Sequence, residues 1–187
     1  MRIRSFAIFV VVLLAAGIAS SQSQAPAKAP APARGMADEI IASWNDVGRK
    51  VIAMAEDWPE DKYEYKPNPE VRSFAGQVLH VAGGNYLFIK AVRGEKWGME
   101  DGDPPRDKYK TKAQVVAFLK QSFADVTALI KQEGDAGLAK TMKYPFGNRM
   151  ILRSLFWMDV LGHGSEHYGQ LVVYYRTNNM VPPESRR

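Results

Sequence analysis

Apolar residues recur every three or four positions along most of the chain from Met36 onward, which is the period of an amphipathic helix. A segment with three prolines interrupts the first stripe, and Ser73 then provides an N-cap for a second helix that contains His80. We therefore expect one helix from near Met36 to Trp58 and another that begins after Ser73. The first stripe consists of Ile40, Trp44, Val47, Val51, Met54 and Trp58.

Two more helices are expected in the second half of the chain. After an irregular stretch at residues 93–110, Thr111 and Gln114 form a capping box, and Gly134 stands where a C′ glycine belongs. The fourth helix is expected from near Asn148 to about Thr177, because two asparagines and then two prolines follow it. The third apolar stripe consists of Val115, Leu119, Phe123 (or Ser122), Val126 and Ile130.

The helices dominate the predicted fold. No alternating strand pattern of any length competes with them, although residues 139–146 (AKTMKYPF) permit a short extended piece. One connection, between the second and third helices, is long. Four amphipathic helices with one long crossing connection predict an all-α fold, a four-helix bundle.

The first 35 residues are unlike the rest. Residues 1–24 are typical of a secretory signal peptide, with two arginines before an apolar run at 6–19 that is short for a membrane span. Small residues follow, so cleavage is expected between positions 19 and 25; the alternative is an uncleaved membrane anchor. Residues 25–35 form an Ala/Pro-rich linker, which leaves 36–187 as the folded domain. We expect an exported protein, periplasmic or secreted, with no stable membrane insertion after cleavage.

The net charge of +5 comes mostly from this N-terminal part. Four of the 25 lysines and arginines precede residue 36 and no acidic residue does, so 21 basic residues face 20 acidic ones in the folded domain. A nearly neutral domain gives no support to nucleic acid as a partner. The chain has no cysteine, so no disulfide and no lipid-modified cysteine is available, and packing must hold the fold.

The candidate chemistry lies in the segment DVLGHGSEHYGQL, residues 159–171. If this segment is helical, Asp159, His163 and His167 share one face, which Gln170 and Tyr174 extend, and two imidazoles four residues apart can bind one metal ion. The third histidine of the chain, His80, shares its helix face with Gln77, Gly84 and Leu87. Three histidines with an open position suit a catalytic Zn²⁺ or Ni²⁺ site.

Each of these interpretations has an alternative. Surface helices produce pairs of histidines at this spacing by chance, and a single histidine such as His80 also occurs as a hydrogen-bonded core residue. Gly162, Gly164 and Gly169 favour a loop, because each costs about 1 kcal/mol in a helix interior relative to alanine. The apolar periodicity continues on both sides of them, so we interpret the segment as helical and the glycines as close-packing positions near a metal.

The segment SFAGQVLH with the small residues after it, followed much later by HGSEHYGQL and the ending VPPESRR, resembles the DinB/YfiT-like family. The resemblance extends from about Met36 to the C-terminus. It implies a four-helix bundle with up-down-down-up topology, a homodimer in many members, and a divalent metal held by His80, His163 and His167. Tyr168 stands where many relatives have arginine, so a role of that arginine does not transfer.

The resemblance further implies metal-dependent transferases and isomerases that use cytosolic thiols. Export would separate this protein from cytosolic thiols, which favours metal-bound water as the nucleophile. We therefore expect a hydrolase or transferase that acts on a small-molecule substrate. Asp159 is a candidate for hydrogen bonding to a ligand histidine or for a general base, and a solvent-facing carboxylate is the alternative. A non-catalytic metal-binding or structural bundle is the other hypothesis, and a cleft of a few hundred Å³ beside the histidines would favour the enzyme.

Overall fold

The computed structural model describes residues 34–186; the predicted signal peptide and nearly all of the linker lie outside this part. Four long helices dominate it: α1 (Met36–Asp57), α2 (Phe74–Arg93), α3 (Lys112–Leu138) and α4 (Arg153–Thr177). The strands β1 (Thr141–Lys143) and β2 (Met150–Leu152) form an antiparallel hairpin before α4. Single 3₁₀ turns lie in the connections, η1 (Glu60–Lys62), η2 (Met99–Gly102) and η3 (Arg106–Lys108), and a fourth, η4 (Pro183–Ser185), follows α4.

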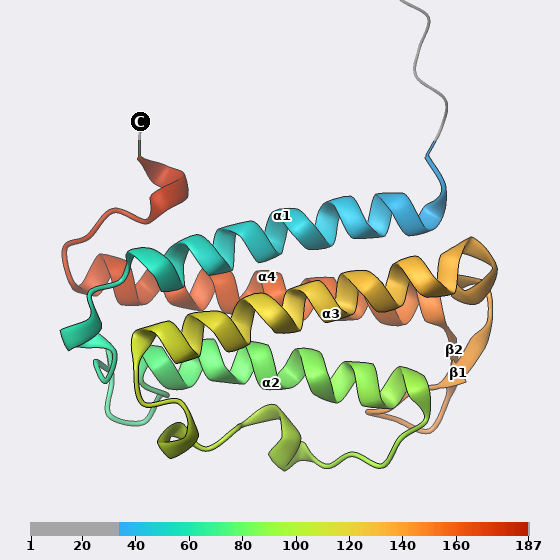
Figure 1. Cartoon of the computed structure of the whole chain (residues 1–187), viewed down its shortest axis with the longest axis horizontal. Helices are drawn as coiled ribbons and strands as arrows, with labels where there is room; N and C mark the ends of the chain where they lie inside the picture. Colours follow the sequence, from blue (N-terminus) through green and yellow to red (C-terminus); the bar gives the residue numbers. More distant parts are fainter. Residues whose placement is uncertain (1–33, 187) are drawn as a thin grey trace, which may run out of the picture. The chain divides into compact units, whose positions relative to one another are not determined.

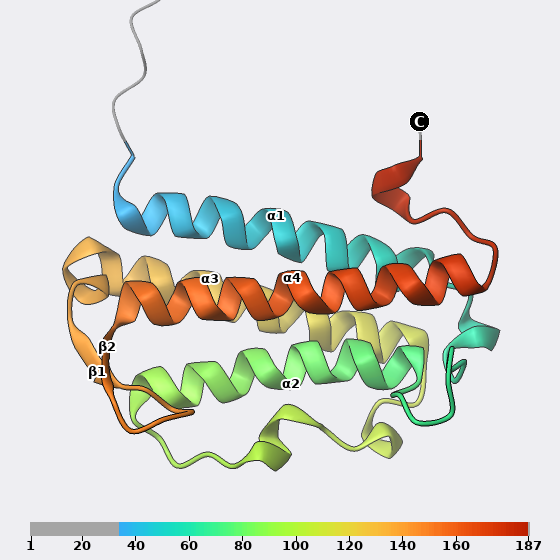
Figure 2. The ribbon, with the colours of Figure 1, turned by 180° about the vertical axis from the view of Figure 1, so that it is seen from behind.

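The helices form a four-helix bundle in which α1 and α2 each pack against both α3 and α4. Helices α1 and α4 run in one direction and α2 and α3 in the other, as Figures 1 and 2 show, so the topology is up-down-down-up. Because α2 and α3 are parallel, the chain must return along the bundle between them, and the α2–α3 connection does so beside α2 (Figure 1). The predicted fold class is confirmed.

Buried aromatic rings join three helices at one end of the bundle. Trp58, just after α1, stacks on Phe74 at the start of α2 with ring centroids 4.4 Å apart. Tyr175, near the end of α4, packs edge-on against Trp58 at 4.9 Å and donates a hydrogen bond to the Met54 carbonyl at 2.8 Å. These contacts bury large apolar surfaces while satisfying the tyrosine hydroxyl, so they fix this end of the bundle.

The predicted helix ends on α2 and α3 are confirmed in detail, with one difference. The Ser73 side chain accepts a hydrogen bond from the Gly76 amide at 3.2 Å, and the capping box of Thr111 is present. Gly134 has the positive φ of 57° expected of a C′ glycine, yet a further helical turn follows it. That turn places Asp135 where its carboxylate accepts the Ala37 amide at 2.7 Å, at the positive N-terminus of α1.

The predicted start of the fourth helix near Asn148 is wrong, because β2 precedes it. Met150–Leu152 pairs with Thr141–Lys143, and Met142 and Ile151 are buried on the same side of the hairpin. The extended piece predicted at 139–146 is thereby confirmed as β1. Residues 159–171 lie wholly within α4, so the helical interpretation of the histidine segment is confirmed.

The glycines of that segment differ in their surroundings. A side chain at Gly162 or Gly169 would meet no atom within 4 Å, so our interpretation of these two as close-packing positions is wrong. Gly164 does pack closely, but against Val47 of α1 at 3.1 Å rather than beside a metal site. The helix persists through all three because its other faces are buried, and tertiary packing outweighs intrinsic propensity.

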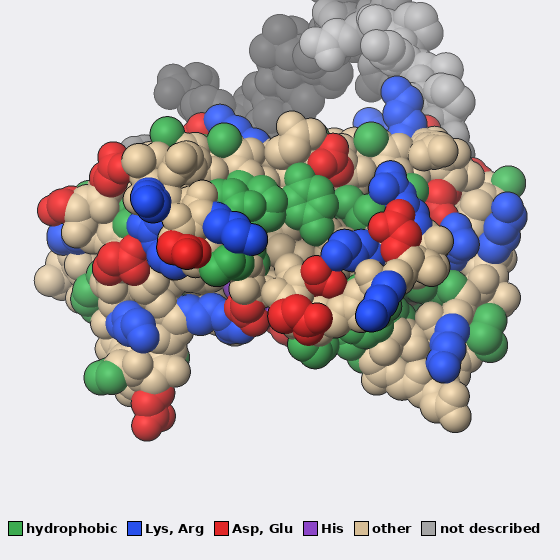
Figure 3. Space-filling view, turned by 60° about the horizontal axis from the view of Figure 1, so that its bottom comes forward, with side chains coloured by type: hydrophobic (Ala, Val, Ile, Leu, Met, Phe, Trp, Pro, Cys, Tyr) green, Lys and Arg blue, Asp and Glu red, His purple; other side chains and the backbone are tan. Residues whose placement is uncertain are grey.

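Helix α3 is, within the described residues, the single helix long and apolar enough to cross a membrane by length and composition. Its apolar residues, among them Val115, Leu119 and Val126, are buried against α1 and α2, so it serves as a core helix of the bundle. On the face seen in Figure 3, basic and acidic side chains alternate and do not gather into one basic patch.

Substitution of two helical glycines by alanine should change stability in opposite directions. We expect Gly162→Ala to raise the unfolding free energy by about 1 kcal/mol, since the added methyl meets open space and favours the helix. In Gly48→Ala the methyl would lie 2.7 Å from Phe123, so this ring would have to shift from its packing on Trp44 at 4.7 Å and the unfolding free energy should fall. Urea unfolding of the two metal-free variants measures the difference, and a destabilised Gly162→Ala would contradict it.

Candidate metal centre

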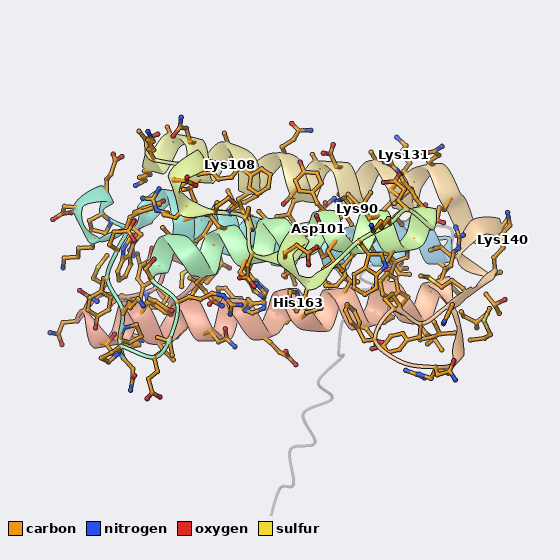
Figure 4. The ribbon with its side chains drawn as sticks, turned by 90° about the horizontal axis from the view of Figure 1, so that it is seen from below. Lys90, Asp101, Lys108, Lys131, Lys140 and His163 are labelled. Atoms are coloured by element: carbon orange, nitrogen blue, oxygen red, sulfur yellow. The ribbon has the colours of Figure 1, made fainter. Side chains whose placement is uncertain are left out.

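The three histidines come together between α2 and α4. His80 lies near the middle of α2, and His163 and His167 lie one turn apart on α4. One ring nitrogen from each lies within 4.8 Å of the others, and the Nε2 atoms of His163 and His167 are 2.9 Å apart. In Figure 4, His163 lies between α4 and α2, close to the α2–α3 connection. The structure thus brings together all three histidines predicted as ligands.

The donor set fits a divalent metal. Two nitrogens bound to one ion at about 2.1 Å each are separated by roughly 3 Å or slightly more, which agrees with the distance between His163 and His167. Burial, helped by the charges of His167 and His80, lowers the pKa of His163 to about 3, and burial also lowers the pKa of His167. Both imidazoles are therefore neutral at physiological pH and offer lone pairs without losing a proton first.

The second nitrogen of His80 is fixed by an acidic residue from the α2–α3 connection. Its Nδ1 lies 3.0 Å from Asp103 Oδ1, and Arg72 donates to the two oxygens of Asp103 at 2.9 and 3.1 Å. Burial acts to raise the pKa of Asp103, but Arg72 and His80 outweigh it and hold this pKa below its usual range. Since Asp103 stays ionised, it accepts the Nδ1 proton and leaves the lone pair of His80 on Nε2.

Two amide side chains orient His167. Gln170 Oε1 lies 2.9 Å from His167 Nδ1, and Gln77 Nε2 donates to the same oxygen at 2.5 Å. Gln77 Nε2 also lies 2.5 Å from His167 Nδ1. Because Nδ1 faces these two amides, His167 presents Nε2 toward His163. Gln77, Gln170 and Asp103 line a groove of about 740 Å³ together with Arg72 and Tyr174, and Tyr174 is itself almost fully buried.

Two adjacent glycines on α2 permit the site to close. A Cβ on Gly84 would lie 3.2 Å from His163 Cε1, so α4 approaches α2 closely at this point. A Cβ on Gly83 would lie 2.5 Å from Pro104 and 2.8 Å from the backbone oxygens of Asp101 and Gly102. Only glycine admits the connection this close, and the connection carries Asp103 to His80.

A cavity of about 310 Å³ adjoins the histidines on the side opposite the groove. His80 and His163 form part of its wall. The other residues around it come from α2, the α2–α3 connection, the hairpin and α4, and most are apolar. They are Gly84, Leu87, Phe88, Met99, Gly102, Tyr144, Phe146, Phe156, Asp159 and Val160. A cleft of this size beside the three histidines is what we expected of an enzyme rather than of a purely structural metal site.

Asp159 lies in the wall of this cavity and is solvent-exposed. Within residues 34–186 its carboxylate makes no hydrogen bond to any of the three histidines, and Asp103 takes the acceptor position beside His80. Asp159 is thus placed to face a bound small molecule rather than to orient a ligand.

Sequence reasoning did not find Asp103 or Arg72. Both lie in irregular segments, and no spacing along the chain relates either residue to a histidine. Gln77 did share the predicted face of His80, one turn before it, so its position was available from helix periodicity. The charged pair would have required knowledge of how the long connection folds back.

Comparison with known proteins agrees with this architecture. A sequence model of the DinB superfamily matches residues 43–171, which include all three histidines. A search of curated proteins gives no match.

Solved structures share the fold at low sequence identity. A DinB-like protein from Bacillus cereus ATCC 10987 has a TM-score of 0.65 at 16% identity, over 78% of this chain and 95% of that one. YfiT from Bacillus subtilis, described as a probable metal-dependent hydrolase with an unusual four-helix bundle topology, gives 0.63 at 13%, over 81% and 94%. The DinB-like protein YjoA from Bacillus subtilis gives 0.61 at 19%, over 76% and 93%.

Replacing Asp103 should weaken metal binding without removing a ligand. We expect Asp103→Asn to lower the affinity for Zn²⁺ by about 10- to 100-fold, because the amide cannot hold the His80 proton as a carboxylate does. Competition with a chromophoric chelator measures the affinity. Asp107→Asn is the matched control, since Asp107 is exposed in the same connection and makes no contact with a histidine. Equal affinities in the two variants would contradict the assigned role of Asp103.

Proposed function

Since the chain belongs to the DinB superfamily, we propose that its three histidines hold a divalent cation and that it hydrolyses a small molecule. The observation that carries the proposal is the convergence of His80, His163 and His167, two of which, His80 and His163, line an apolar cavity of about 310 Å³. YfiT, which shares the fold, is described as a probable metal-dependent hydrolase, and this supports the same reaction class.

The number of protein ligands favours catalysis over a structural role. Within residues 34–186, the group of side chains able to bind a metal here contains three histidines and no fourth His, Asp or Glu. Structural zinc sites close the coordination shell with four protein ligands, whereas catalytic sites keep a position open for substrate or water. The cavity lies beside the histidines and gives a small molecule access to that position.

Different residues would bind the metal, orient its ligands and transfer the proton. A bound divalent cation would supply Lewis acidity that polarises the scissile group of the substrate. His80 and His167 are held in one orientation by Asp103 and Gln170, so little reorganisation accompanies the reaction. Asp159 accepts a proton from the attacking water as the water oxygen bonds to the substrate, and it returns this proton to the leaving group as the scissile bond breaks.

We also propose that the protein is exported after cleavage between positions 19 and 25, which rests on the N-terminal sequence pattern. Mass spectrometry of the protein recovered from cell fractions measures both features. A mature chain that begins at one of residues 20 to 25 in the extracytoplasmic fraction is expected. Recovery of the full-length chain in membranes would instead support the uncleaved anchor.

The metal content should follow the histidines. We expect the full chain to hold about one equivalent of Zn²⁺ or Ni²⁺, and His163→Ala to hold less than about a tenth of an equivalent. Elemental analysis after dialysis measures both. Glu166→Ala, an exposed acid on the same helix outside the cavity, is the control and should retain the metal. Chelation should also lower the melting temperature of the wild type, and identical metal contents in all three proteins would refute the proposed centre.

Asp159 should affect turnover rather than metal binding. We expect Asp159→Asn to lower kcat for hydrolysis of small aryl esters such as 4-nitrophenyl acetate by about 100-fold or more, the usual cost of removing a general base. Metal content should stay at the wild-type value because, within residues 34–186, Asp159 forms no hydrogen bond to the three histidines and is not part of the metal-binding group. A variant with unchanged kcat would remove Asp159 from the reaction.

A further inference from the structure

Two large apolar side chains stand exposed at the mouth of the cavity. Met99 of η2 is 66% exposed and Phe146, in the turn between β1 and β2, is 47% exposed, and both line the cavity. They belong to two segments far apart in the sequence, the α2–α3 connection and the hairpin. Exposed apolar side chains that converge on one opening leave surface in water that an apolar ligand would cover.

A row of aromatic rings leads from His163 to this mouth. His163 meets Phe88 edge to face at 5.2 Å and 88°, and Phe88 meets Phe146 in the same way at 6.2 Å and 90°. Tyr144 meets Phe146 at 5.9 Å and 82°. Rings that stand perpendicular to one another present both faces and edges to the cavity, which are the two surfaces that a further aromatic ring prefers.

The hairpin is built to hold Phe146 in this place. The Tyr144 amide donates to the Arg149 carbonyl at 2.8 Å, and the Arg149 guanidinium lies over the Tyr144 ring at 4.5 Å. These contacts close the turn around Phe146. Trp97 packs on Phe146 from the connection, with ring centroids 5.7 Å apart.

The charges around the cavity disfavour an ionic ligand body. Among residues 34–186, Asp159 is the one residue lining the cavity that carries a formal charge when the histidines are neutral, and no lysine or arginine of this range lines it. With no metal bound, a carboxylate would meet no cation among these lining residues and would lose hydration against the apolar walls. An ammonium group would lose hydration against apolar walls, and the attraction of an exposed aspartate is too strongly screened to compensate.

We propose that the cavity binds an uncharged aromatic ring, so that the substrate is a small aryl ester or amide. Phe88 and Phe146 contact the ring, and the scissile carbonyl faces His80 and His163. Phe146 is the residue that determines specificity. The reaction assigned to the carbonyl rests on the proposed function, whereas binding of the ring depends only on side chains of the chain itself.

Binding to the metal-stripped full chain separates these two parts. NMR titrations with 2-naphthamide, 2-naphthoate and 2-naphthamidine compare a neutral, an anionic and a cationic ligand that share one ring system. We expect 2-naphthamide to bind at least tenfold more tightly than either ion, and Phe146→Ala to weaken its binding about tenfold. Met150→Ala is the matched control, because Met150 is 63% exposed on the same hairpin and does not line the cavity.

Two results would overturn the inference. One is tighter binding of either ion than of the amide, and the other is an equal effect of Phe146→Ala and Met150→Ala. Decahydronaphthalene-2-carboxamide tests the aromatic preference, and an affinity equal to that of 2-naphthamide would also refute it. Because no metal is present in these titrations, a failure here is distinct from a failure of the metal-content or hydrolysis experiments.

Discussion

The close approach allowed by Gly83 and Gly84 on α2 is the constraint on which the site depends. Parallel packing of α2 and α3 forces the chain back along the bundle, and Gly83 admits the returning connection to within contact of the α2 backbone. The next residue, Gly84, admits the ring of His163 from α4. A side chain at either position would push away one of the two segments that complete the site around His80.

The histidines separate two environments with different chemistry. On one side Asp103, Gln77 and Gln170 hold the second ring nitrogens in a polar groove. On the other side lies the apolar cavity, and Asp159 is the only acid that lines it in the part of the chain that the structure describes. The groups that orient the histidines therefore do not occupy the positions of the groups that would contact a substrate. Loss of an orienting residue should act on metal affinity, and loss of a cavity residue should act on turnover or specificity.

The helical part of this arrangement could be predicted from sequence, because apolar periodicity and end caps are local properties. Ser73 and Thr111 cap as expected, and placing His80 and His167 on helices left few ways for them to meet. The start of α4 could not be predicted, since pairing of β2 with β1 is a tertiary contact that overrides helix propensity. The position of Asp103 beside His80 could not be predicted for a similar reason. It follows from the path of an irregular connection, which has no periodic sequence pattern.

The two ends of the bundle have different structural demands. At one end Trp58, Phe74 and Tyr175 are fully buried. Ring packing and the hydrogen bond from Tyr175 to Met54 connect α1, α2 and α4 there, so this end is rigid. Toward the other end Phe146 and Met99 remain exposed around the cavity. If other side chains of the protein covered these two residues, they would occupy the space that a ligand needs. The histidines lie between, with His167 buried toward the rigid end and His163 in the cavity wall. Stability and ligand access are thus assigned to different turns of the same helices, so the chain can keep an open apolar mouth without loosening the residues that would hold a metal.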